Sequence, residues 1–475
     1  MRLTPLFAGL ALISSATLAG AATPPHQGGH SARHADAPVR KDHALLHAVA
    51  ADVSAERLHA IIAKLVSFGT RSTISETTSD TRGIGAARRW VKGEFDGISK
   101  DCDGCLEIVT PSSVASGSRY LKPTEVMDVV AIQRGTSDPD RVVVITGHLD
   151  SRNSDILNLD KDAPGADDDG SGAAAVMEAA RVLSKHKFAA TIVYSVDSGE
   201  EQGLDGGKVI AAYAKAHGWR VEADLNNDII GNSHGLNGVH DDSHVRVFSE
   251  GTKAVETAAE SARRRYNGGE VDSPSRNLAR YMQDLSERYV AGLSVKMVYR
   301  TDRYGRGGDQ TEFLALGYPA VRVTEAAENY TRQHQDVRVE NGIHYGDVLS
   351  GVDFPYLAKV VRLNIVTLAS LASAPPPPED IKIEGAVSDD TTASWKAAPG
   401  AVDYRVWWRD TTLPTWTNAR SSGGATTLKL KNVVIDDWFF GVSSLSADGW
   451  ESPVEYPGPA GSFVTAPPPP APAAK

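Results

Sequence analysis

Residues 141–146 read RVVVIT, residues 191–196 read TIVYSV and residues 223–230 read ADLNNDII, and these three segments decide the fold. Each has the length of a strand, and the first two are rich in β-branched residues. Two segments with helical spacing lie between them, at 171–184 and 206–216. Strands that alternate with helices of this length indicate an α/β fold, in which a mostly parallel sheet is covered by helices on both faces.

The same alternation extends to both sides of this stretch. Further helices are predicted at 42–66, 83–95, 255–265 and 352–373, and further strands at 129–133 and 320–324. A chain of 475 residues has room for a large domain of this kind and a smaller second domain. We expect residues 43–374 to form the large domain.

Four prolines, Pro375 to Pro378, end this pattern. Beyond them, short alternating runs separated by turn residues predict an all-β sandwich. The placement of Trp395, of Tyr404 and of the strand-like run at 439–443 resembles fibronectin type III modules. The predicted boundaries are a stiff proline-rich linker at 375–379, the fibronectin type III-like domain at 380–457 and a disordered tail at 458–475.

The N-terminus has the order of a secretory signal peptide. Met1 and Arg2 precede an apolar stretch at 6–18, and small residues follow it. We expect residues 1–21 to be removed on export, which predicts a secreted or periplasmic protein. A retained anchor is the alternative, although the stretch is shorter than the roughly 20 residues that span a bilayer. Residues 22–42 are predicted to be disordered, and no later segment looks long and apolar enough for a membrane span.

Net charge and cysteine content indicate which partners and which cysteine roles are expected. The 49 Lys+Arg and 60 Asp+Glu residues give a net charge of -11 without long runs of one sign, which argues against a nucleic-acid partner. In an exported protein, Cys102 and Cys105 are expected to form a local disulfide. A redox pair or a structural zinc site is the alternative, but the chain has no further cysteines to complete such a zinc site.

Polar clusters follow the predicted strands, where ligands bind in parallel sheets. They are HLD at 148–150, DDD at 167–169 before a helix, EE at 200–201, an aspartate at 228 inside the third segment, and YTRQHQD at 330–336. A helix cap accounts for one acidic residue of the triple run, but three adjacent carboxylates repel each other unless a cation neutralises them. Each cluster alone is also compatible with a purely structural role.

Together and in this order, HLDS (148–151), PGADDDGSG (164–172), EEQGL (200–204), DIIG (228–231) and the late histidine closely resemble the bacterial leucyl aminopeptidase family of co-catalytic two-zinc exopeptidases. The resemblance covers roughly residues 43–370. It implies the zinc exopeptidase fold, with a mixed, mostly parallel sheet. It also implies two Zn²⁺ ions as cofactors and peptide or protein N-termini as substrates.

The resemblance also assigns roles to individual residues. One zinc would be held by His148 and Asp228, the second by Glu201 and His334, with Asp168 as the bridge between them. The general base would be Glu200, and Asp150 would orient the histidine ligand at 148 from behind. A cis peptide bond is implied after the bridging aspartate.

Some positions leave alternatives open. Asp167 is the alternative bridge, and His344 is the alternative last ligand. Gln310 stands where the family often has histidine, and we expect it beneath the site or in the pocket wall. For the preferred N-terminal residue of the substrate, the resemblance implies apolar side chains, which are the family's default.

Three rival functions remain. A related two-zinc carboxypeptidase or dipeptidase would use a basic residue for the substrate carboxylate, and Arg303 and Arg306 could serve. A glutaminyl cyclase has the same fold with one zinc, which the full set of five ligands disfavours. A catalytically inactive protein that contacts a surface or polymer through the sandwich is the alternative of another class.

Overall fold

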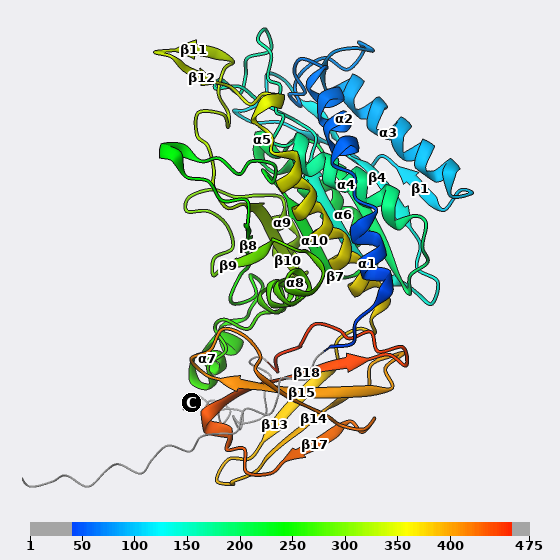
Figure 1. The fold of residues 1–475 in the computed structure, drawn as a ribbon, viewed down its shortest axis with the longest axis vertical. Helices are drawn as coiled ribbons and strands as arrows, with labels where there is room; N and C mark the ends of the chain where they lie inside the picture. Colours follow the sequence, from blue (N-terminus) through cyan, green and yellow to red (C-terminus); the bar gives the residue numbers. More distant parts are fainter. Residues whose placement is uncertain (1–39, 458–475) are drawn as a thin grey trace, which may run out of the picture. The chain divides into compact units, whose positions relative to one another are not determined.

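A computed structural model describes residues 40–457, coloured in Figure 1. The predictions for 1–21, for most of 22–42 and for the tail at 458–475 lie outside the described residues. Residues 40–42 had been predicted to be disordered, but they are ordered. The guanidinium of Arg40 donates to the carbonyl oxygen of Ser452 at 3.2 Å and to that of Glu451 at 3.5 Å.

An eight-stranded mixed sheet forms the centre of the α/β part, with the order β1-β4-β6-β5-β7-β10-β8-β9. Its strands are β1 Leu106–Val109, β4 Val129–Gln133, β5 Asp138–His148, β6 Ala190–Asp197, β7 Arg220–Asn227, β8 His244–Phe248, β9 Ser294–Val298 and β10 Ala320–Glu325. Strand β5 is parallel to β6 and β7, and β7 is parallel to β10. The carboxyl ends of these four central strands therefore meet at one edge, where a ligand site is expected.

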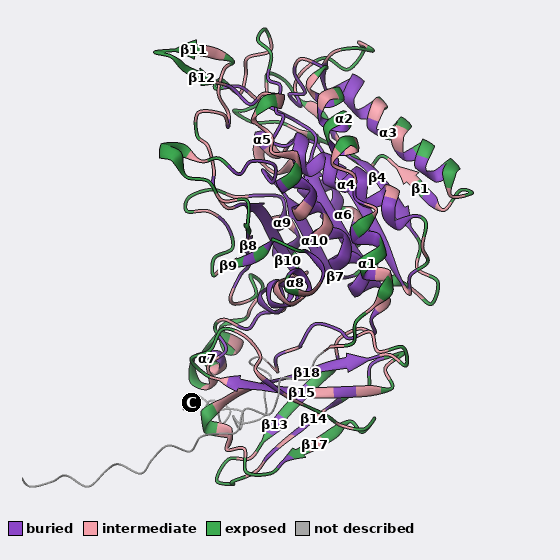
Figure 2. Cartoon of the chain, in the orientation of Figure 1, coloured by how far each residue is buried: buried purple, intermediate pink, exposed green. Residues whose placement is uncertain are grey.

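Helices cover both faces of this sheet. One face packs against α1 Ala44–Ala51, α2 Ala55–Val66, α3 Gly83–Asp101, α4 Gly170–Leu183, α8 Pro274–Tyr289 and α10 Phe354–Ser373, and the other packs against α6 Asp205–Ala216 and α9 Gln310–Ala315. Because side chains alternate along a strand, Val143 and Ile145 of β5 enter the first core, and Val142 and Val144 enter the second. Because the central strands are buried on both faces of the sheet, their sequences are nearly continuous apolar runs (Figure 2).

Helix α10 corrects one expectation from the sequence. By length and composition it could cross a membrane, although no later segment had been predicted to do so. However, 78% of its most apolar window is buried inside the protein, as in the core helix of a globular fold. Asp353 caps the helix by accepting a hydrogen bond from the backbone N–H of Tyr356.

Short elements complete the α/β part. They are the hairpins β2 Ser112–Ala115 with β3 Thr124–Met127 and β11 Arg338–Glu340 with β12 Ile343–Tyr345, the helices α5 Glu200–Gly203 and α7 Ala258–Asn267, and the 3-10 turns η1 Leu236–Gly238 and η2 Leu349–Gly351. Cys102 and Cys105, which follow α3, form a disulfide. The predicted local pairing is confirmed.

The C-terminal part consists of two antiparallel three-stranded sheets. One has the order β13-β14-β17 and the other β16-β15-β18. Their bounds are β13 Glu379–Glu384, β14 Thr391–Lys396, β15 Asp403–Asp410, β16 Asn418–Ser421, β17 Thr427–Leu430 and β18 Trp438–Leu445, with a 3-10 turn, η3 Ile435–Asp437. Trp395, Tyr404 and Phe440 lie in their shared core, so the expected small all-β part is present. Its membership of the fibronectin type III class stays a prediction.

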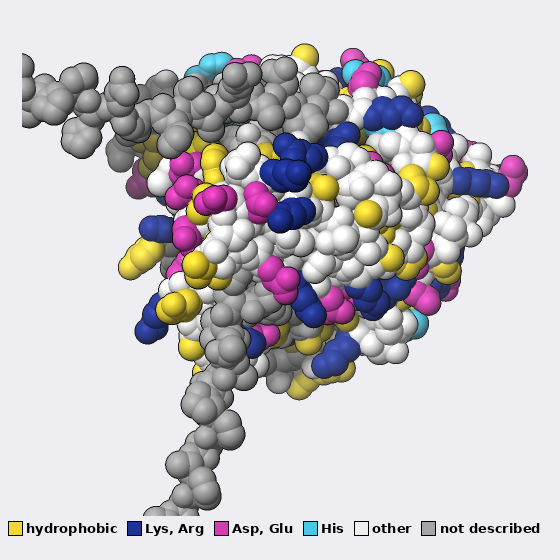
Figure 3. Space-filling model, turned by 90° about the horizontal axis from the view of Figure 1, so that it is seen from below, with side chains coloured by type: hydrophobic (Ala, Val, Ile, Leu, Met, Phe, Trp, Pro, Cys, Tyr) yellow, Lys and Arg dark blue, Asp and Glu magenta, His cyan; other side chains and the backbone are white. Residues whose placement is uncertain are grey.

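The proline run is not a free spacer. Pro375 and Pro378 are buried, and the hydroxyl of Ser444 donates to the carbonyl oxygen of Pro376 at 2.6 Å. Its packing depends on a partner far away in the sequence, and its stiffness stays a prediction. On the face shown in Figure 3, basic and acidic side chains are interspersed, in keeping with the mixed charge of the sequence.

Candidate active site

The central strands deliver the predicted site residues to one edge of the sheet. His148 is the last residue of β5, and Glu200 and Glu201 open α5 shortly after β6 ends at Asp197. Asp228 had been placed inside a strand, but β7 ends at Asn227, so this carboxylate leaves the sheet. Asp168 precedes α4, and His334 lies between β10 and β11.

These side chains form two triads that share Asp168. The first is His148, Asp168 and Asp228, and the second is Asp168, Glu201 and His334. Nε2 of His148 lies 3.2 Å from Oδ1 of Asp168, and Nε2 of His334 lies 3.0 Å from Oδ2 of Asp168. Nε2 of His334 is also 3.0 Å from Oε1 of Glu201. The two oxygens of one carboxylate therefore face two different ligand groups, as a bridging ligand requires.

The donor atoms of both triads fit zinc. His148 Nε2, Asp168 Oδ2 and Glu201 Oε1 are buried, and among residues 40–457 they lie close to the other site atoms without forming a hydrogen bond of regular geometry. A buried polar atom without a partner is costly, and imidazole nitrogen and carboxylate oxygen are ordinary zinc ligands. Burial alone would lower the pKa of His334, but the carboxylates of Glu201 and Asp168 raise it to about 10. The negative charge of this cluster thus attracts a cation, which a metal ion satisfies.

The three adjacent aspartates at 167–169 make different contacts. Asp167 accepts the N–H of Gly231 at 2.7 Å, and burial raises its pKa to about 6. Asp169 accepts from Gly172 at 2.8 Å at the start of α4 and from the N–H of His148 at 2.9 Å. Only the middle residue, Asp168, joins the triads, and the bond that follows it is the cis peptide that the resemblance implied. The outer two aspartates therefore fix backbone positions.

Asp150 contacts different atoms from those expected. Nδ1 of His148 lies 3.0 Å from the backbone oxygen of Asp150, whereas the closest carboxylate oxygen is 3.4 Å away. The carboxylate instead accepts the backbone N–H groups of Glu200 at 3.3 Å and Glu201 at 3.2 Å. Asp150 is therefore a positioning residue for the start of α5 as much as for the histidine.

Glu200 stands beside the triads without belonging to either. It lines a cavity of about 400 Å³ together with Asp168, Glu201, Asp228 and His334. Burial, reinforced by nearby carboxylates and opposed by His148, raises the pKa of Glu200 to about 8. A carboxyl group with this pKa can both accept and release a proton near neutral pH.

Comparisons with known proteins decide the family. Residues 128–341 match the sequence profile of Peptidase family M28. A "probable zinc metalloprotease" of Leptosphaeria maculans is 44% identical over 420 residues, which cover 87% of this chain and 97% of that relative. A protein of the same description from Pyrenophora teres f. teres is 43% identical over 423 residues and covers 87% of each chain. The chain belongs to peptidase family M28.

This M28 peptidase shares its fold with two solved Legionella pneumophila structures. LapA aminopeptidase has a TM-score of 0.50 at 20% identity, covering 71% of this chain and 77% of that chain. LapB has a TM-score of 0.51 at 19% identity, covering 70% and 76%. These similarities show the fold, and the family with its relatives makes the chain a zinc metallopeptidase that acts on peptides.

One arginine next to Asp228 was missed from the sequence, and Arg303 had been considered only as a partner for a substrate carboxylate. Arg322, which is fully buried in β10 of this M28 peptidase, lies 2.6 Å from Oδ2 of Asp228, and Arg303 lies 3.9 Å from the same oxygen. An arginine inside the apolar run AVRVTE was the available signal, because a buried arginine needs an acidic partner. A fully buried Arg71 was missed too; it donates to the backbone oxygens of Leu149 and Gly165, which flank site residues.

The structure also shows where His344 and Gln310 lie relative to the site. His344 lies in the exposed strand β12 and belongs to neither triad, whereas His334 does. Gln310 is buried behind the site, and its Nε2 donates to Asp302 at 2.7 Å. Asp302 in turn lies 3.4 Å from Arg322, so Gln310 supports the ion pairs around Asp228. The prediction that Gln310 lies beneath the site agrees with this placement.

Proposed function

We propose that this M28 peptidase is a secreted aminopeptidase that uses two zinc ions to remove residues from free peptide N-termini. The proposed ligands are His148 with Asp228, Glu201 with His334, and Asp168 between the two pairs. The LapA aminopeptidase shares the fold, so the scaffold is compatible with this reaction. Export follows from the signal peptide expected at residues 1–21.

In this proposal, Glu200 transfers a proton from the attacking water to the leaving amine. Bound zinc would polarise the scissile carbonyl and lower the pKa of the attacking water. As the water oxygen attacks the carbonyl carbon, the carboxylate of Glu200 accepts a proton from it. When the carbon–nitrogen bond breaks, Glu200 returns that proton to the leaving amine. The observation that carries this assignment is the place of Glu200 in the cavity, beside both triads but in neither.

Glu200 is also the best partner for a substrate ammonium group. Asp228 lines the same cavity, but its Oδ2 already pairs with Arg322 at 2.6 Å. Glu200 forms no ion pair within 4.0 Å with any Lys or Arg between residues 40 and 457. A free N-terminus held on this side of the cavity would place its first peptide bond over the triads.

A second candidate, a two-zinc dipeptidase or carboxypeptidase, is favoured by the arginines that line the same cavity. These are Arg119, Arg152, Arg303 and Arg306. Arg303 and Arg306 both pair with Glu328, at 3.4 and 3.3 Å, so their charge is partly balanced. Arg152 lies 4.0 Å from Glu201, and Arg119 donates to the backbone oxygen of Glu201. Both could bind the free carboxylate of a short peptide.

The first experiment compares leucine para-nitroanilide with its N-acetylated analogue, before and after zinc chelation. We expect zinc-dependent cleavage of the free-amine substrate alone. The variant Glu200→Gln lacks the proposed general base, so its kcat should be lower by roughly 10² to 10⁴-fold. Glu384→Gln, on the exposed side of β13, is the matched control and should retain full activity. Cleavage of the blocked substrate, or of neither substrate by zinc-loaded protein, would contradict the proposal.

A second substrate pair distinguishes the two candidates. Leu-Leu and Leu-Leu-amide differ only in the C-terminal carboxylate. An aminopeptidase cleaves both at similar rates, whereas a dipeptidase prefers the free acid by about tenfold or more, since tenfold corresponds to roughly 1.4 kcal/mol. Arg152→Gln should abolish that preference only if the arginine binds the carboxylate.

A further inference from the structure

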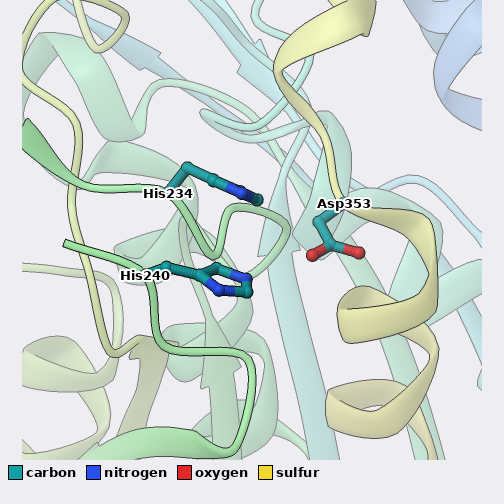
Figure 4. A group of neighbouring side chains, drawn as sticks. All are labelled: His234, His240 and Asp353. Atoms are coloured by element: carbon teal, nitrogen blue, oxygen red, sulfur yellow. The ribbon is translucent and has the colours of Figure 1, made fainter. Parts of the chain in front are cut away.

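A second group of metal-binding side chains lies outside the catalytic triads. Figure 4 shows His234, His240 and Asp353, with the nitrogen-bearing edges of both imidazole rings turned toward the carboxylate. One donor atom from each residue lies within 4.8 Å of the other two. Both histidines are exposed and the aspartate is half-buried, so the group is open to solvent. None of the five proposed zinc ligands belongs to it.

The backbone holds the two histidines side by side. His234 and His240 face each other across an isolated antiparallel bridge, and the N–H of Gly235 donates to the oxygen of Val239 at 2.9 Å. The turn between them uses positive φ angles at Asn237 and Gly238, the region that asparagine and glycine adopt most readily. The ring centroids are 4.3 Å apart. Their spacing is therefore set by a closed turn.

Asp353 is fixed by the helix that it caps. Its Oδ1 accepts the N–H of Tyr356 at the start of α10, and its own N–H donates to the oxygen of Gly231 at 2.7 Å. The hydroxyl of Ser233 donates to Oδ2 of Asp353 at 2.5 Å and lies 3.0 Å from Nδ1 of His234. The buried core helix thus holds the carboxylate opposite the histidine turn.

We propose that His234, His240 and Asp353 form a third metal site, which binds a zinc-class transition-metal ion from solution. Three protein ligands with water in the fourth position make a tetrahedral site, whose donor atoms lie about 3.3 Å apart for zinc. The three donors lie within 4.8 Å of one another, so binding requires them to move closer together. Two imidazoles favour zinc, copper or nickel over calcium and magnesium, which prefer oxygen ligands.

This site lies on a segment that also leads to the catalytic triads. His234 follows Asp228 by six residues, and the intervening Asn232 accepts a hydrogen bond from Arg332 at 2.7 Å. Arg332 precedes His334 by two residues. A metal ion here would join the turn at 234–240 to the start of α10 and restrain this wall of the active site.

The test measures zinc bound per chain. Full-length protein with its catalytic zinc in place is dialysed against Zn²⁺ alone, in parallel with the variants His234→Ala and His240→Ala, and bound metal is measured by mass spectrometry. We expect each variant to bind one zinc equivalent fewer than the parent protein. His344→Ala, which removes an exposed histidine from β12, is the matched control and should lose none. The histidines of residues 22–42 are present in every sample and contribute equally.

A second readout shows where the metal binds. Hydrogen exchange of residues 232–241 should slow when Zn²⁺ is added to the parent protein, but not in the two histidine variants. Asp353→Asn keeps a side chain that can cap α10 but removes the negative ligand, so it should weaken zinc binding without unfolding the helix. Equal zinc content in the parent protein and both histidine variants would overturn the proposal, whatever the activity of the catalytic site.

Discussion

Asp150 illustrates how one side chain sets the geometry of its neighbours. Its carboxylate accepts the backbone N–H groups of both Glu200 and Glu201, which fixes the proposed base and a proposed ligand at once. Asn has a single acceptor oxygen and no charge, so it can keep only one of these hydrogen bonds. The effect of substituting Asp150 should therefore appear at the proton-transfer step.

For Asp150→Asn we expect kcat to fall by roughly 10 to 100-fold with both catalytic zinc ions retained, because groups that orient ligands and bases have effects of this size. Stopped-flow or steady-state assays with leucine para-nitroanilide, together with zinc analysis, measure this. Asp160→Asn changes an exposed aspartate of the neighbouring loop and should leave kcat unchanged. Loss of a zinc ion with an unchanged pH profile would show instead that Asp150 acts through His148.

At the scale of elements, the loop after β10 is organised by Glu328. Its carboxylate pairs with Arg246 and lies 3.4 Å from Arg303, and Nε2 of Gln333 donates to it at 3.1 Å. Burial would raise its pKa, but Arg303 and Arg246 lower it to about 2. A carboxylate with a lowered pKa stabilises the fold above its unfolded-state pKa, and this stabilisation is lost as the pH falls.

For Glu328→Gln we expect a loss of stability on the order of 2 kcal/mol at pH 7, which shrinks as the pH falls from about 5 toward 2. Urea unfolding of zinc-free parent and variant at several pH values measures the difference without a contribution from acid release of zinc. Glu340→Gln, on the exposed hairpin strand β11, is the control. A difference that stays constant across this pH range would contradict the role of the ionised carboxylate.

Local sequence patterns predicted most elements, whereas the roles of the candidate site residues came from the family resemblance. The apolar runs of β4, β5 and β6 and the periodicity of α4 and α10 are short-range signals, and His148 and Glu200 stood out because they follow such strands. Arg322 acts on Asp228 from 94 positions away, so no local pattern connects the pair. The end of β7 was misplaced because the apolar Ile229 and Ile230 extend the strand pattern past Asn227.

At the scale of the whole molecule, a buried ion pair joins the α/β part to the sandwich. Asp272, fully buried, lies 2.7 Å from Arg280 and 2.6 Å from Arg409 of β15. In addition, Nε1 of Trp416 donates to Asn277 at 3.1 Å. Together with the packed proline run, these contacts connect the two parts directly. Contact of the sandwich with a surface or polymer stays a prediction.

Because this interface is buried and charged, we expect both parts to unfold in one calorimetric transition. Arg409→Met leaves Asp272 with a single partner, which should destabilise the protein by roughly 3 kcal/mol, since breaking a buried pair costs several kcal/mol. The signal of Trp395 and Trp408 in the sandwich core should change at the same temperature as the circular dichroism of the helices, because both parts unfold together. Arg420→Met, at an exposed position on β16, is the control and should not shift the transition. Two separated transitions in the parent protein, with the tryptophan signal unaffected by Arg409→Met, would show that the sandwich is an independent module.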